Sequence, residues 1–329
     1  MRSPSHDLLP DPLHPAARLA MVVGFVVAGG LVGALIGMPL GFTLTELEAT
    51  SLAFLGDHTP FPAGWREFVE INQIVIGVAA FGVAPLLMLR LTLARRLFGE
   101  WRRKRFGAAP VVGLVGAGAL GIVGFPLYRA LIEWTARLLP HVADAAWATT
   151  HLTARAAATV NRFDTFAHLL LSVLVLGGVA SVGQELTLRG ILQPTLSRWA
   201  GGRAGVGIWL VALMSGVIND ANLLIAYSVF AAAAGYLYAW SGRLWVPIAT
   251  TFILNATERA HMYVLQHAPR GGAPANVAAR GWPGWLIVGS ALATSLLLWW
   301  LRRYLLAHAV PLASLPPSLS GRYPAASDA

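Results

Sequence analysis

The sequence predicts an all-α integral membrane protein with about eight transmembrane helices. Of its 329 residues, 56% are hydrophobic and only 12% are charged, which is about half the charged fraction of a typical soluble domain. Long apolar stretches recur along the chain, and a helix needs about 20 apolar residues to cross the roughly 30 Å of hydrocarbon in a bilayer. These two observations exclude an ordinary soluble fold.

Eight apolar segments meet this length requirement. The least regular is the run 205–241, which either crosses twice around a polar turn at 219–222 or forms one tilted helix and a re-entrant segment. The long connections 43–70 and 133–165 mix apolar and polar residues, so they are either amphipathic interfacial segments or ordinary structured loops. The predicted spans are 19–42, 71–94, 110–132, 166–190, 205–222, 223–241, 244–263 and 284–301.

The spans define one polytopic membrane domain over residues 19–308. Residues 1–18 form an N-terminal tail without the basic-then-apolar order of a cleaved signal peptide, and residues 309–329 form a disordered tail rich in Pro and Ser. The densest basic run lies in the short loop 95–105, and cytoplasmic loops carry the excess of basic residues. Both termini are therefore predicted to be cytoplasmic, in a multi-pass protein of the cell's inner membrane.

Composition also limits the chemistry and the partners. The chain has no cysteine, which excludes disulfides, thiolate zinc sites, cysteine nucleophiles and iron–sulfur clusters. The net charge is +9, but the basic residues do not form a stripe interleaved with aromatic residues. We therefore expect the bilayer as partner and no nucleic acid. We expect no cofactor and no metal site. The sequence also lacks His-Glu-x-x-His, Gly-x-Ser-x-Gly and Gly-x-Gly-Asp, the signatures of other membrane proteases.

Few ionisable groups lie inside the predicted spans, where each costs at least about 2.5–3.5 kcal/mol and therefore suggests a function. Glu185 and Arg189 stand four residues apart, a spacing that predicts an ion pair along one helix face. Two further clusters lie on later spans. They are Thr251, Asn255 and Glu258, which share one helix face, and Asn219, Asp220 and Asn222, which interrupt the fifth span.

Counting residues from the cytoplasmic helix ends gives these clusters a common depth. At about 1.5 Å per residue, Glu185, Asn222 and Asn255 each lie roughly 18–20 Å from that end. We therefore expect the fourth, fifth and seventh spans to bring them together. The alternative is that these groups only satisfy one another as interhelical hydrogen bonds, which contribute about 0.6 kcal/mol each on average.

Residues 183–194 resemble the first motif of the CPBP (Abi) family, the membrane endopeptidases that process CAAX prenyl proteins and bacteriocins. That motif reads Glu-Glu, three residues, then Arg, commonly followed by Gly. Arg189 and Gly190 match it, and Glu185 matches the second glutamate. Gln184 occupies the position of the first glutamate.

The second and third motifs of that family also have counterparts. Residues 215–223 are similar to the second motif, an aromatic residue followed four positions later by histidine, with Ile218 and Asn222 at these two positions. A Gly-x-Leu-Trp run precedes the third motif, in which Thr251 stands at the histidine and Asn255 matches the asparagine. The resemblance covers about residues 165–256 and implies the family's eight-helix membrane core.

The substituted positions decide what the resemblance implies about activity. In the family, the first glutamate and the second-motif histidine activate a water molecule, while the third-motif histidine and asparagine stabilise the oxyanion. The amides of Gln184 and Asn222 cannot accept a proton near neutral pH, and Thr251 can donate a hydrogen bond but does not titrate. We therefore predict a degenerate homologue that binds a peptide or lipid ligand, or serves another membrane protein as an accessory subunit.

Two other functions remain open. In an active endopeptidase for a prenylated or hydrophobic peptide, Glu185 or Asp220 would replace the missing base, although Arg189 favours the charged form of Glu185 and weakens it as a base. A small transporter would require broken helices near residues 219–222 and a continuous polar path. Together, the candidate catalytic set is Glu185, Arg189 and Asn255.

Overall fold

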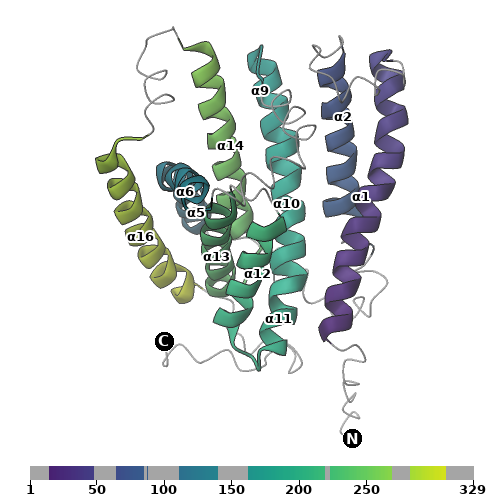
Figure 1. Ribbon diagram of the computed structural model, residues 1–329. Helices are drawn as coiled ribbons and strands as arrows, with labels where there is room; N and C mark the ends of the chain where they lie inside the picture. Colours follow the sequence, from purple (N-terminus) through teal and green to yellow (C-terminus); the bar gives the residue numbers. More distant parts are fainter. Residues whose placement is uncertain are drawn as a thin grey trace, which may run out of the picture.

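The computed structural model describes residues 15–47, 64–84, 87, 111–139, 162–218, 223–268 and 282–308. These residues form helices and short connections, and none of them is in a β-strand. Each predicted span coincides, over its described residues, with one helix or with consecutive helices (Figure 1). The predicted all-α fold is therefore confirmed for this part of the chain. The predicted C-terminal tail, residues 1–14 and most of the two long connections lie outside it.

The long helical segments are assembled from α-helical and π-helical pieces. The elements in chain order are α1 (Pro15–Thr45), α2 (Trp65–Gly77), η2 (Val78–Val83), α5 (Val111–Val123), α6 (Phe125–Leu138), α9 (Phe166–Ser172), η3 (Val173–Val179), α10 (Ala180–Glu185), η4 (Leu186–Leu192), α11 (Gln193–Trp199), α12 (Ala204–Ile218), α13 (Leu224–Ser241), α14 (Trp245–His267) and α16 (Gly284–Ala307), where η marks a π-helix. Among the described residues, four segments are long and apolar enough to cross a membrane, or five if α5 and α6 count as one. Eight passes therefore stay a prediction.

The run 205–241 forms a helical hairpin made of α12 and α13. Figure 1 shows that α12 begins and α13 ends at the lower end of the bundle, and that the hairpin occupies its lower half. The 15 described residues of α12 extend over about 22 Å. The two helices approach closely, because Gly216 faces Leu224 and Ser228 with no room for a side chain. The turn at 219–222 lies outside the described residues.

A stripe of glycines packs α1 against α2 and η2. A Cβ atom added at Gly33 would lie 2.7 Å from Cα of Ile76, and one at Gly29 would lie 2.7 Å from the carbonyl oxygen of Ala79. Small residues of this kind let helix backbones approach where lipid supplies no hydrophobic driving force. The stripe consists of Gly29, Gly33, Gly37 and Gly41, at intervals of four residues.

On the opposite side of the bundle, α5 packs against α14 and α16. A Cβ atom at Gly121 would lie 2.7 Å from the backbone nitrogen of Leu254, and one at Gly116 would lie 2.8 Å from Cδ2 of Leu301. α14 also contacts α6, α9, α10 and α13. It is therefore the central helix of this half of the molecule.

The predicted span 110–132 is not one straight helix, because it breaks into α5 and α6 with a bend of 43°. The hydroxyl of Ser290 on α16 is inserted at the break. It accepts a hydrogen bond from the backbone nitrogen of Leu127 at 3.2 Å and donates one to the carbonyl oxygen of Val123 at 2.6 Å. In a regular helix these two backbone groups would bond to each other, and a side chain inserted between them is a known cause of a kink.

Candidate functional site

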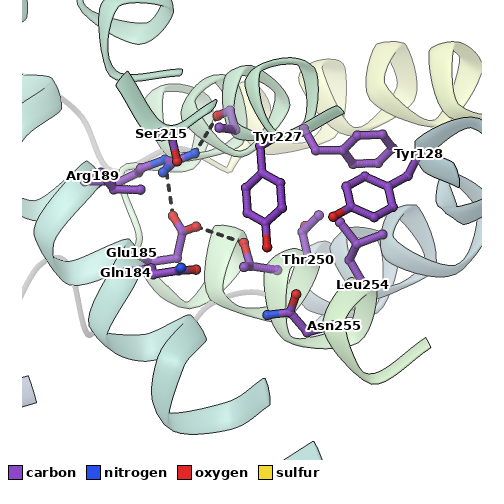
Figure 2. Close-up of a pocket in the computed structure, with 13 residues that line it drawn as sticks. Tyr128, Gln184, Glu185, Arg189, Ser215, Tyr227, Thr250, Leu254 and Asn255 are labelled. Carbon is purple, nitrogen blue, oxygen red and sulfur yellow. Dashed lines mark hydrogen bonds and ion pairs between the residues drawn. The ribbon is translucent and has the colours of Figure 1, made fainter. Parts of the chain in front are cut away.

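A pocket with mixed polar and apolar walls lies between α10, η4, α13 and α14, and residues of α6 and α12 complete it (Figure 2). About 470 Å³ of space within it, including its opening, is free of atoms. Five of the candidate residues predicted from the sequence line it together: Gln184, Glu185, Arg189, Thr251 and Asn255. Its other polar lining residues are Tyr128, Ser215, Tyr227 and Thr250.

A buried ion pair forms one wall of the pocket. Nε of Arg189 lies 3.2 Å from Oε2 of Glu185, which confirms the pair predicted from their spacing. The two residues expose only 1% and 2% of their surfaces. The guanidinium of Arg189 also donates a hydrogen bond to the carbonyl oxygen of Ala231 on α13. The helix changes from α to π between the two charges, at Leu186, and such π-helical turns are frequent at functional sites.

Thr251 holds the second oxygen of the same carboxylate. Its hydroxyl donates a hydrogen bond of 2.8 Å to Oε1 of Glu185 (Figure 2). Glu185 thus accepts from α14 with one oxygen and faces Arg189 with the other. The two sequence candidates Thr251 and Glu185 are therefore bound to each other.

The remaining candidates of α10 and α14 face the same space. Asn255 on α14 donates a hydrogen bond of 3.2 Å from Nδ2 to Oγ of Ser181 on α10. This bond joins the two helices one turn away from the bond between Thr251 and Glu185. Gln184 lines the pocket next to Glu185, and its amide has no hydrogen-bond partner among the described residues. The predicted convergence of the fourth and seventh spans is therefore observed. Asn222 and Asp220 lie outside the described residues.

Glu258 does not reach the pocket. Its carboxylate lies 4.0 Å from the guanidinium of Arg129 on α6, one turn beyond Asn255. The sequence placed Thr251, Asn255 and Glu258 on one face of α14, but only the first two line the pocket. Glu258 pairs with α6 instead. Within the described part of the chain, no three His, Asp or Glu side chains come together as metal ligands would.

Sequence reasoning missed two tyrosines of the site. Tyr128 on α6 and Tyr227 on α13 both line the pocket, and their rings meet edge-on with centroids 6.1 Å apart. Tyr128 lies one turn beyond the break between α5 and α6, so the break determines where it points. The signal available in the sequence was Pro126 after Gly124, a pair that often ends or kinks a helix.

The apolar helices define a membrane protein, and the pocket with its buried ion pair lies between them. Residues 166–257 match the family model described as Type II CAAX prenyl endopeptidase Rce1-like. They form a domain of this family, which confirms the resemblance predicted from the motifs over about residues 165–256. The domain begins with α9, ends within α14 and covers less than a third of the chain. No curated protein and no solved structure matches the chain.

Proposed function

We propose that the protein is a catalytically inactive relative of the CAAX-type membrane endopeptidases and binds a hydrophobic peptide or lipid in its pocket. The observation that supports this proposal is the state of Glu185. It is the only carboxylate among the described pocket residues, and both of its oxygens are already engaged, one by Thr251 and one by Arg189.

Hydrolysis requires a group that takes a proton from water. If Glu185 took up this proton, it would lose its charge and leave the buried charge of Arg189 without a counter-ion, which is strongly unfavourable. Gln184 and Thr251 stand where the family has titratable residues, and neither an amide nor an aliphatic hydroxyl can serve as a base near neutral pH. The described groups can bind a ligand by hydrogen bonds, but they do not supply a base.

We also propose that the chain crosses the inner membrane with both termini in the cytoplasm. α1 begins and α16 ends at the same end of the bundle (Figure 1). At this end of the bundle, the described residues at the helix termini include basic residues and no acidic residue, as expected for a cytoplasmic face. These basic residues are Arg203, Arg243, Arg302 and Arg303.

The test uses the purified full chain with a fluorescent farnesylated peptide that ends in a CAAX sequence. We expect saturable binding without cleavage. The variant Leu188→Trp fills the pocket from a half-buried position and should abolish binding. Leu213→Trp is the matched control, because Leu213 is 52% exposed on the outer face of α12.

Turnover would support the alternative, an active endopeptidase. If the wild type cleaves the peptide and Glu185→Gln or Asp220→Asn abolishes the cleavage, the pseudoenzyme proposal is wrong. If the peptide neither binds nor is cleaved, the pocket is not a site for this ligand class, and an accessory role in a larger membrane complex becomes the better explanation.

A further inference from the structure

Two arginines at the lower end of the bundle have no acidic partner among the described residues. Arg243 lies in the connection from α13 to α14, and Arg302 lies near the end of α16. Both residues are half-buried, and Nε of Arg243 is buried without a hydrogen-bond partner. A donor left in this state is costly, so an acceptor beside it is favoured.

The helices that end beside these two arginines pack against each other. Leu237 and Trp240 of α13 belong to the same hydrophobic cluster as Leu301 and Leu305 of α16. Figure 1 shows the lower end of α16 beside the lower part of α13, and the two helices are in contact. The two guanidinium groups therefore belong to one end of one packed unit.

The direction of Arg302 follows from the contacts of its neighbours on α16. A Cβ atom added at Gly116 of α5 would lie 2.9 Å from the ring of Trp300, and one at Gly113 would lie 3.8 Å from the ring of Tyr304. These two aromatic side chains therefore face α5. Two residues along a helix turn a side chain by about 200°. Arg302, which is two residues from each of them, points away from α5 and stays free to meet a ligand.

Tryptophans place both arginines at the level of the lipid headgroups. Trp240 precedes Arg243 by three residues, and Trp299 precedes Arg302 by three residues. Tryptophan side chains gather at the membrane interface, and Trp299 is 53% exposed. The guanidinium of Arg303 lies 4.4 Å from the centre of the Trp299 ring. The phosphates of the adjacent leaflet are therefore within reach of this part of the chain.

The charge at this end of the bundle selects an anionic headgroup. A zwitterionic headgroup carries an ammonium group next to its phosphate, and no acidic residue among the described helix termini here would attract that ammonium. A headgroup whose only charge is its phosphate meets no such repulsion. Guanidinium groups bind phosphate oxygens through charge-assisted hydrogen bonds, often in parallel pairs. Basic sites between membrane helices bind anionic headgroups in this way.

We infer that Arg243 and Arg302 bind the phosphate of an anionic phospholipid at the lower ends of α13 and α16. Acyl chains of this lipid have an apolar surface to lie on, because Leu292 and Leu296 of α16 are 61% and 66% exposed. Neither arginine lines the pocket. The inference is therefore independent of the proposed ligand in the pocket and adds a second site to the molecule.

The test uses the purified full chain in a mild detergent and native mass spectrometry to count bound lipids. Phosphatidylglycerol is compared with phosphatidylcholine that carries the same acyl chains. One arginine near an anionic headgroup contributes about fivefold in affinity, so we expect a preference of at least about tenfold for phosphatidylglycerol. The double variant Arg243→Gln/Arg302→Gln should lose this preference and bind phosphatidylcholine as the wild type does, and each single variant should lose about fivefold.

The matched control is Arg203→Gln/Arg303→Gln, which removes the same charge from exposed positions at the same end and should keep the preference. An equal loss in this control would mean that the attraction is a diffuse effect of net charge, and the inference would be wrong. A wild type that binds both lipids equally would also overturn it. Displacement of the bound lipid by inorganic phosphate would assign the site to a free anion instead.

Discussion

Replacing Glu185 with glutamine removes one charge of the buried pair and almost preserves its shape. Arg189, which is 1% exposed, would then be a buried cation without a counter-ion. Removal of one partner of such a pair typically costs about 3–5 kcal/mol. We expect a loss of unfolding free energy of this size for Glu185→Gln.

A milder change separates the hydrogen bond from the charge. Thr251→Val keeps the volume of the side chain and deletes only the hydroxyl that donates to Glu185 at 2.8 Å. Neutral interhelical hydrogen bonds average about 0.6 kcal/mol in membranes, but bonds to charged groups contribute about 1.5–3 kcal/mol. Because Glu185 is 2% exposed, we expect a cost in the upper range. The control is Thr294→Val, since the buried hydroxyl of Thr294 has no partner among the described residues.

Both effects can be measured on the full chain in mixed micelles, from the loss of helical circular dichroism as the fraction of denaturing detergent increases. The double variant Glu185→Gln/Arg189→Met removes both charges, so we expect it to cost less than the sum of its singles by at least about 2 kcal/mol. Additive costs, or a cost below about 1 kcal/mol for Glu185→Gln, would show that the two charges do not interact as the structure indicates.

Three further predictions concern the scaffold and its orientation. Gly33→Ala should destabilise the chain by about 1–3 kcal/mol through overpacking against α2, whereas Gly30→Ala, with nothing within 4 Å, should be neutral or slightly stabilising; equal effects would contradict the packing. Ser290→Ala should straighten the break between α5 and α6, so a spin-label distance between α6 and α14 should change, and an unchanged distance would assign the bend to the backbone alone. In this cysteine-free chain, Arg303→Cys should react with an impermeant maleimide only from the cytoplasmic side and Arg162→Cys only from the opposite side, and the reverse pattern would invert the topology.

Local spacing was sufficient to predict the ion pair and the shared face of Thr251 and Asn255. Residues four apart on one helix are neighbours whatever the tertiary structure, and the structure places Arg189 beside Glu185 accordingly. The meeting of α10 with α14 could also be anticipated, because helical rise converts residue counts into depth when helices share a membrane. The family domain at residues 166–257 was recognisable from the spacing of its motifs.

The contacts that depend on departures from a regular helix were not predictable in this way. The sequence assigned one continuous span to 110–132, and nothing in that assignment singled out Tyr128. Its place in the pocket depends on the inserted hydroxyl of Ser290, which is distant in sequence. Likewise, the sequence suggested an oxyanion-type donor at Thr251, whereas the structure shows its hydroxyl bound to Glu185.

The hairpin of α12 and α13 has a consequence for the lipids around it. Val217, near the inner end of α12, is 71% exposed, and Leu213 one turn earlier is 52% exposed, so acyl chains contact this helix along its outer face. Ser215, on the same helix, lines the pocket. We therefore expect an amphiphile dissolved in the bilayer to approach the pocket along this flank, without first passing through water.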